Sequence, residues 1–220
     1  MKDFFSYNIK LLFSPIKWIG AFIFITFIAL FMYAPTYYDF TNICEIYIPF
    51  IGIILMTDIM LVDKYNNISE ILYISDGKLK KVFLIRYIII VVFIMLLCFS
   101  ANIIFFIQGY FKGELYLNEP VTILEFLLVS VSSTIFLGTL SMTMANVLSN
   151  PYISYGCSVI YWLYWNINST KQSIFNLFPF VAKPTDYIIY ILIDFIIISL
   201  LILINLILSE KSPFFIKSKF

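Results

Sequence analysis

The 220-residue sequence contains no histidine and only three cysteines, Cys44, Cys98 and Cys157. The lack of histidine excludes histidine-based acid–base catalysis and histidine metal ligands. The cysteines are isolated and odd in number, so they offer neither a metal-binding spacing nor a disulfide framework. Only seven glycines are present, and none belongs to a GxxxxGK[ST] phosphate-binding loop. We therefore expect no catalytic residue, no metal site and no ATP-binding site in this chain.

Charge is scarce as well, because 12% of the residues are charged whereas 62% are hydrophobic. A soluble domain is about a quarter charged and about half apolar. The charges are too few to cover a soluble surface, and several apolar runs approach or exceed the length of about 18 residues that marks a membrane span. The composition indicates an all-α polytopic membrane protein in which residues 1–220 form a single transmembrane domain. A net charge of +1 gives no reason to expect binding to nucleic acid.

Hydropathy predicts six transmembrane helices, at residues 18–34, 46–62, 82–107, 121–148, 152–168 and 187–208. Residues 1–17 are amphipathic up to Pro15, which predicts an N-terminal interfacial helix lying along the membrane. Residues 169–186 are too polar to span a membrane and too apolar for a free loop. We expect this stretch to be a re-entrant or interfacial external segment before the sixth span.

The basic residues set the orientation of these spans. Six spans place both termini on one side of the membrane, and 11 of the 14 lysine and arginine residues then lie on that side. The other three are Lys112, Lys171 and Lys183. This bias predicts that both termini and the polar segment at residues 63–81 are cytoplasmic. Abundant isoleucine, phenylalanine, tyrosine and asparagine are typical of an AT-rich genome, so we expect a multi-pass protein of a bacterial cytoplasmic membrane.

The polar segment at residues 63–81 predicts a short helix outside the membrane. Asn67 and Glu70 fit a capping box, in which each side chain satisfies a free backbone N–H group. An apolar stripe follows at helical spacing, formed by Ile68, Ile71 and Leu72. Gly77 suits the left-handed residue that ends a helix. A two-turn helix at residues 68–76 is too short to be stable alone, so it must pack on lipid headgroups or on a soluble partner.

Two stretches resemble type-2 ABC transporter permeases. The segment ISEILYISDGKLKKVFLIRYI, residues 68–88, resembles the cytoplasmic loop of that family between its second and third spans. There a glutamate, an apolar doublet, a turn residue and a basic cluster precede the third span. The segment FLGTLSMTMANVLSNPYISYGCSVIYWLYW, residues 136–165, is similar to the family's fourth span, tight inner turn and fifth span. The small external loops leave no room for the large extracellular domain of some export permeases.

The resemblance implies a permease subunit of a bacterial ABC exporter, paired with a second permease subunit as a homo- or heterodimer in the lipid membrane. ATP and Mg would be bound by separate cytoplasmic ATPase subunits, so this chain is not expected to be an enzyme or to hold a cofactor. Residues 68–76 would form the coupling helix. The implied ATPase-coupling residues are Asn67, Ile68, Ser69, Glu70, Ile71, Leu72, Tyr73 and Gly77. The apolar, aromatic spans favour an amphipathic peptide, toxin or antibiotic as the exported substrate.

Three acidic residues, Asp58, Glu125 and Asp194, fall within the expected spans. Ionised carboxylates are energetically unfavourable in hydrocarbon, so each of the three is a candidate for function. Asp194 lies deepest in its span, and either a structural role or a role in the transport pathway is open to it. The serines and threonines of the fourth span favour close helix packing over lining a pathway. Two alternatives remain for the whole chain. It could be a stand-alone membrane immunity or structural protein, or an intramembrane enzyme whose one conceivable dyad is Asp58 with Asp194.

Overall fold

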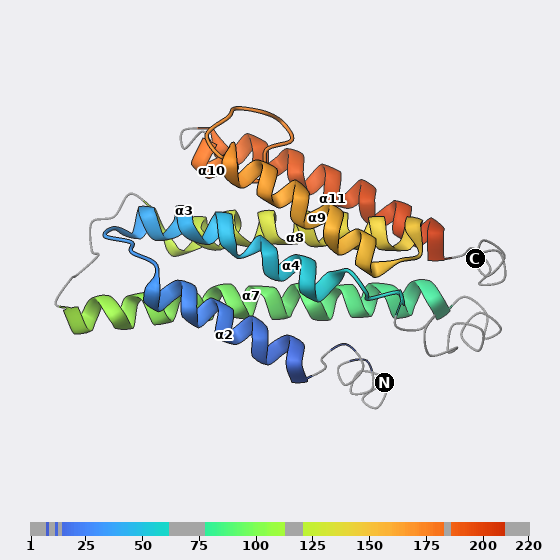
Figure 1. The fold of residues 1–220 in the computed structure, drawn as a ribbon, viewed down its shortest axis with the longest axis horizontal. Coiled ribbons are helices and arrows are strands. Elements are labelled where there is room, and N and C mark those ends of the chain that lie inside the picture. The colour runs from blue at the N-terminus through green and yellow to red at the C-terminus, as the bar shows by residue number, and fades with distance from the viewer. Residues whose placement is uncertain are drawn as a thin grey trace.

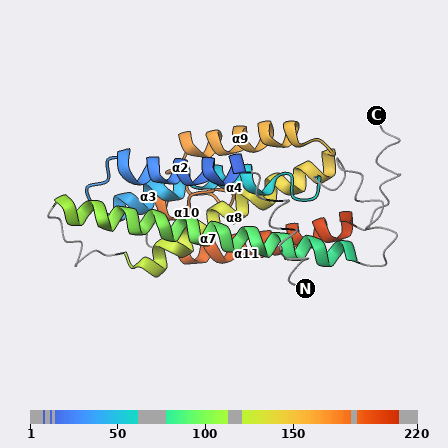
Figure 2. The ribbon, with the colours of Figure 1, turned by 90° about the horizontal axis from the view of Figure 1, so that it is seen from below.

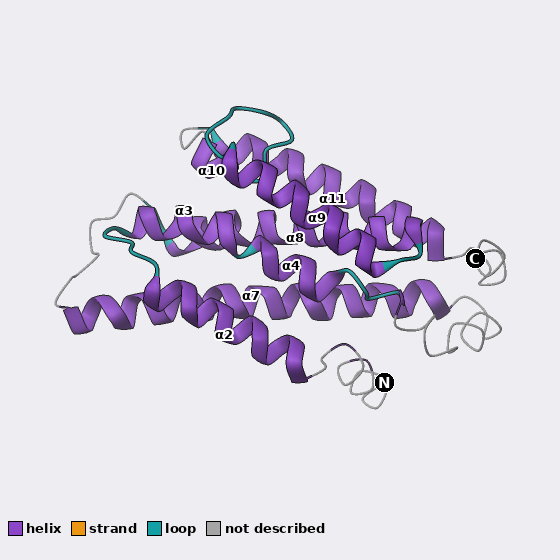
Figure 3. Cartoon of the chain, in the orientation of Figure 1, coloured by secondary structure: helices purple, strands orange, loops and turns teal. Residues whose placement is uncertain are grey.

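The computed structural model describes residues 8, 12, 15–61, 78–112, 121–182 and 186–209. Within this part of the chain every regular element is a helix and none is a strand (Figure 3). The helices, in chain order, are α2 (Pro15–Phe31), α3 (Tyr37–Tyr47), α4 (Pro49–Met56), α7 (Lys78–Lys112), α8 (Ile123–Leu148), α9 (Pro151–Ile167), α10 (Pro179–Ala182) and α11 (Tyr187–Ser209). The expectation of an all-α chain is confirmed over the described residues.

The helices have the length and the outer surface of a membrane bundle. Among the described residues, four stretches are long and apolar enough to cross a membrane, namely Tyr37–Met56, Lys80–Lys112, Ile123–Leu148 and Tyr187–Ser209. Large apolar side chains cover the outside, and on α11 more than half of each of these is exposed: Ile188, Leu192, Ile196, Leu203 and Ile207. Water would disfavour such a surface whereas lipid does not. The chain is therefore a multi-pass membrane protein.

The long helices lie side by side around α8 (Figure 1). Helix α8 packs most extensively against α4 and α11, and it also contacts α3, α7 and α9. Figure 2 shows α9 on the opposite side of the bundle from α7 and α11. We call the end where α4 stops and α7 begins the inner end, and the end where α7 stops and α8 begins the outer end. Helices α8 and α11 both run from the outer end to the inner end.

Polar residues define where several helices begin. Thr36 precedes α3, and its hydroxyl oxygen accepts the N–H of Asp39 at 3.0 Å. Thr122 and Glu125 form a capping box at the start of α8. Asn150 caps α9, and it follows Ser149, whose φ of 54° is the left-handed conformation that allows the tight turn from α8 to α9. These local bonds satisfy N–H groups that have no partner inside the helix.

The expected second span, residues 46–62, is wrong in its boundaries. The helical stretch runs from Tyr37 to Met56, because the cap at Thr36 starts a helix where the sequence predicts a loop up to Glu45. Pro49 lacks an N–H group and divides the stretch into α3 and α4.

The remaining expected boundaries agree with the structure to within a few residues. The other five expected spans are each helical over most of their length. Pro15, Ile16 and Lys17 belong to α2 and not to the expected interfacial helix, of which only residues 8 and 12 are otherwise described. The described part of the expected external segment at residues 169–186 contains the four-residue α10.

Helices α4 and α8 approach each other closely because glycines face the contact. A Cβ atom on Gly52 would lie 2.3 Å from the backbone oxygen of Thr134, and one on Gly138 would lie 2.9 Å from the backbone oxygen of Gly52. Buried hydroxyl residues on α8 surround this contact, including Ser130, Ser133, Thr134 and Ser141. This agrees with the expectation that small polar residues of the fourth span allow close helix packing.

Candidate functional site

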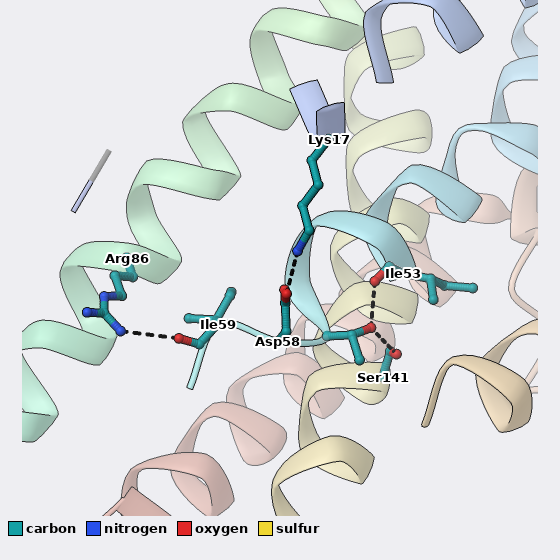
Figure 4. A network of polar contacts seen from close by, with 7 residues as sticks. Lys17, Ile53, Asp58, Ile59, Arg86 and Ser141 are labelled. Atoms are coloured by element: carbon teal, nitrogen blue, oxygen red, sulfur yellow. Dashed lines mark hydrogen bonds and ion pairs between the residues drawn. The ribbon is translucent and has the colours of Figure 1, made fainter. Parts of the chain in front are cut away.

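Residues 57–60 form a turn after α4, and several helices are joined there by polar side chains (Figure 4). The hydroxyl oxygen of Thr57 lies 2.5 Å from that of Ser141 on α8. The backbone oxygen of Ser141 in turn accepts the hydroxyl of Ser154 on α9 at 2.5 Å. All three side chains are fully buried. The turn is thereby linked to α8 and, through α8, to α9.

An ion pair links the same turn to α2. Lys17 donates from Nζ to Oδ2 of Asp58 at 2.5 Å, and each side chain is about a quarter exposed (Figure 4). The sequence places Asp58 inside the second span, whereas the structure places it beyond the end of α4. Asp58 is therefore a paired carboxylate at the inner end and not an isolated charge within the bundle.

Breaking this ion pair should have a small effect. We expect Lys17→Ala or Asp58→Ala to lower the free energy of unfolding by less than about 1 kcal/mol, because both groups are partly exposed. The exchanged variant, Lys17→Asp with Asp58→Lys, should recover most of that loss. Thermal unfolding in detergent of the wild type, Lys17→Asp, Asp58→Lys and the exchanged variant measures the coupling. If the effects of the two single changes simply add in the exchanged variant, the ion pair is contradicted.

Arg86 connects α7 to the turn. The side chain is 2% exposed, and its Nε donates to Oδ1 of Asn8 at 2.7 Å. Its Nη1 donates to the backbone oxygen of Ile59 at 3.3 Å (Figure 4). Sequence reasoning counted Arg86 only as one of the cytoplasmic cations and missed its burial. The signal was its position inside the expected third span, where a lone cation needs polar partners.

The contact between Arg86 and Ile59 joins the two chain ends that flank residues 62–77. The predicted coupling residues, from Asn67 to Gly77, lie outside the described residues, as does the predicted helix at residues 68–76. The bundle end to which this segment is attached is nevertheless well defined. Residues 57–60 contact α2 through the ion pair and α7 and α8 through hydrogen bonds. Helix α9 is connected to them indirectly, through its hydrogen bond to α8.

A second buried polar layer lies on the inner half of α8. Asn146 donates to Oδ1 of Asn205 on α11 at 2.6 Å, and Asn205 donates to the hydroxyl oxygen of Thr143 at 2.7 Å. On another side of α8, the hydroxyl groups of Tyr87 and Thr139 lie 3.0 Å apart. These bonds fix the rotation of α7 and α11 about α8, because packing of apolar side chains alone is not directional.

At the outer end, the fully buried carboxylate of Glu45 holds α10. Its Oε1 accepts the N–H of Phe180 and its Oε2 accepts the N–H of Val181, each at 2.9 Å. These N–H groups belong to the first turn of α10 and have no partner within that helix. The sequence does not predict a role for Glu45, because it places the residue in an external loop. A long-range contact between residues 45 and 180 leaves no local sequence signal.

Replacing Glu45 with glutamine should loosen α10. The glutamine has nearly the same volume, but one acceptor oxygen becomes an NH2 group that faces an N–H donor. Losing one such bond should lower the free energy of local opening by about 1–3 kcal/mol. Hydrogen exchange at Phe180 and Val181 measures it, with Asp39→Asn on the same helix as the matched control. Equal exchange in the two variants would contradict the assignment.

Glu125 and Asp194 lie in different surroundings. Glu125 closes the α8 capping box, with its Oε2 accepting the N–H of Thr122 at 2.7 Å, while Tyr187 donates to its Oε1 at 3.0 Å. Glu125 is thus a helix cap at the outer end. Asp194 lies on the buried face of α11 and is 4% exposed, and its Oδ2 has no hydrogen-bond partner among the residues that the structure describes.

The structure does not bring Asp58 and Asp194 together. Asp194 precedes Asn205 by eleven residues on α11, or about 16 Å along a helix, and Asn205 bonds to Thr143 near the inner end. Asp58 follows Thr57, which contacts Ser141, only two residues from Thr143. The two carboxyl groups therefore lie at different depths, and they do not form the dyad of an intramembrane enzyme.

No protein-family model matches the chain, and no curated protein or solved structure matches it.

Proposed function

We propose that this chain is the permease subunit of a bacterial ABC transporter that exports an amphipathic peptide, toxin or antibiotic. A separate cytoplasmic ATPase, with its ATP and Mg, would drive it, and a second permease subunit would complete the pathway. In this proposal α2 and α9 are the first and fifth of six spans. Each has 17 residues, about 26 Å as a helix, which is slightly less than the hydrocarbon thickness of about 30 Å.

The observation that carries the proposal is the set of polar contacts at the two chain positions that flank residues 62–77. These contacts join the flanking residues to several helices of the bundle. Arg86 joins the chain entering this segment, at Ile59, to the helix that leaves it. The Lys17–Asp58 pair adds α2 to the same point. A force applied to the segment by a soluble partner would therefore act on several helices at once. A merely lipid-bound loop has no need of such an attachment.

Helix α7 provides a lever from this point to the other end of the bundle. It has 35 residues without interruption, so it is about 50 Å long. A displacement of its first turns by a bound ATPase would be carried to the outer end as a tilt of one rigid element. The coupling helix at residues 68–76 is proposed as the contact with the ATPase.

The orientation follows from the basic residues of the described part. Lysine and arginine at the inner end are Lys17, Lys78, Lys80, Lys81 and Arg86, whereas those at the outer end are Lys112 and Lys171. This asymmetry supports a cytoplasmic inner end.

Purification in mild detergent tests the proposal. A tagged chain should recover an ATPase subunit from its native membranes, and Glu70→Ala combined with Ile71→Arg should uncouple ATP hydrolysis from export. The control is Tyr110→Arg, which places a cation on an exposed side chain at the outer end of α7. If no ATPase is recovered, the stand-alone membrane protein becomes the better assignment. If export survives the change at residues 70 and 71, the coupling assignment is wrong.

A further inference from the structure

Asp194 is a buried carboxyl group, and the described helices that pack against α11 place no opposite charge beside it. Helix α8 carries Glu125 in its first turn and no charged residue after it, and α10 carries none. Helix α7 has no charged residue between Arg86 and Lys112. With Oδ2 also lacking a hydrogen-bond donor, an ionised Asp194 would be left without compensation inside the membrane, which is strongly unfavourable.

A second carboxyl group makes a charge on Asp194 still less favourable. Glu45 of α3 and Tyr161 of α9 are titratable groups that lie close enough to Asp194 to interact with it electrostatically. Tyr161 donates its hydroxyl to the backbone oxygen of Phe175 at 2.8 Å. Glu45 is also completely buried, which opposes its ionisation, but each of its two carboxyl oxygens accepts an N–H group from α10, and hydrogen bonds of this kind favour the ionised carboxylate. Two ionised carboxylates in one buried place repel each other.

We propose that Asp194 is a proton-binding site in the outer half of the bundle, and that it holds its proton while Glu45 carries the negative charge that fastens α10. The docking of α10 on Glu45 and the protonation of Asp194 are then linked. While α10 is docked, Glu45 is charged and Asp194 keeps its proton. When α10 separates from Glu45, water can reach both groups and Asp194 can release the proton toward the outer side. This site is independent of any ATPase, so it can be tested whether or not the chain is a permease.

A proton is the ligand that fits best. The described residues include no group of three or more acidic, cysteine or histidine side chains that could hold a metal ion. A hard cation such as Ca²⁺ needs six or more oxygen ligands, whereas a proton needs one. The free Oδ2 of Asp194 supplies that one atom.

Infrared difference spectroscopy of the full chain in lipid tests the site. The spectrum of the wild type minus Asp194→Asn at neutral pH should contain the C=O stretch of one protonated carboxylic acid. This band should shift in D2O. A carboxylate band in its place would overturn the proposal, and a change of that band when sodium replaces choline would identify a bound cation instead.

A second measurement needs no variant of Asp194. Dicyclohexylcarbodiimide reacts with protonated carboxyl groups inside membranes, and mass spectrometry then locates the modified residue. We expect modification of Asp194, decreasing at alkaline pH, and none at Glu125. At a given alkaline pH, the fraction of Asp194 modified should be at least about twofold lower in Glu45→Gln than in the wild type. The reason is that Asp194 loses its proton more readily when the neighbouring negative charge is absent. The control variant Glu125→Gln should leave this fraction unchanged. Modification that is equal in the two variants would overturn the linkage between Asp194 and Glu45.

Discussion

Replacing Gly52 with alanine is expected to destabilise the bundle by about 1–3 kcal/mol, and replacing it with leucine should prevent α4 from packing on α8. The added Cβ would lie 2.3 Å from the backbone oxygen of Thr134. A backbone oxygen in a helix cannot rotate away, so the helices must separate. That separation would also break the 2.5 Å contact between Thr57 and Ser141. Thermal unfolding in detergent and the yield of folded protein measure the effect.

The chain contains matched controls for this change. Gly20 and Gly156 also lie in helices, but a Cβ atom on either would meet nothing within 4 Å. Gly20→Ala and Gly156→Ala should therefore be neutral or slightly stabilising, since alanine favours a helix more than glycine does. Gly138→Ala should fall between these cases, because one of its close neighbours is the flexible end of Met56. If Gly52→Ala unfolds at the same temperature as Gly156→Ala, the close contact of α4 and α8 is wrong.

Removing the side chain of Arg86 should produce the second large effect. Arg86→Ala leaves the backbone oxygen of Ile59 and the side chain of Asn8 without this donor. Hydrogen bonds to a charged group contribute about 1.5–3 kcal/mol each, and part of that should be lost together with the packing of the long side chain. Hydrogen exchange should increase at the inner ends of α4 and α7 and remain unchanged at the outer end.

The choice of substitutions separates the geometry of Arg86 from its charge. Arg86→Lys keeps the charge, but one ammonium group cannot replace donors at both Nε and Nη1, so we expect only partial recovery. Lys81→Ala removes a cation from an exposed position on the same helix and should change the stability by less than about 0.5 kcal/mol. Equal effects of Arg86→Ala and Lys81→Ala would show that the Arg86 contacts do not stabilise the inner end.

Much of the bundle could be predicted from the sequence because it depends on local signals. Apolar length places α7, α8 and α11, and the Ser149-Asn150-Pro151 turn places the start of α9. The start of α3 was missed, although Thr36 followed by Asp39 is also a local capping signal. The hydropathy pattern favours a loop at this position instead, because the acidic residues Asp39 and Glu45 lower the local hydropathy.

The candidate site was less accessible to sequence reasoning because its contacts are long-range. Asp58 looks like an intramembrane charge until Lys17 is seen beside it. Glu45 has no local feature that would reveal its bonds to α10. Asp194, by contrast, was identified from the sequence as the deepest carboxyl group, since depth along a single apolar helix is a local property. The structure adds that its Oδ2 has no hydrogen-bond partner within the described part of the chain.

Residues 68–76 are proposed to transmit force from a cytoplasmic ATPase to the bundle, and this is the central proposal for the chain. A photoreactive amino acid at position 71, compared with the same group at Tyr110 on the exposed outer end of α7, tests it in native membranes. We predict that illumination joins position 71 to a nucleotide-binding subunit, that ATP changes the yield, and that position 110 forms no such product. Crosslinks from position 71 to lipid alone, or equal products from the two positions, would contradict the claim.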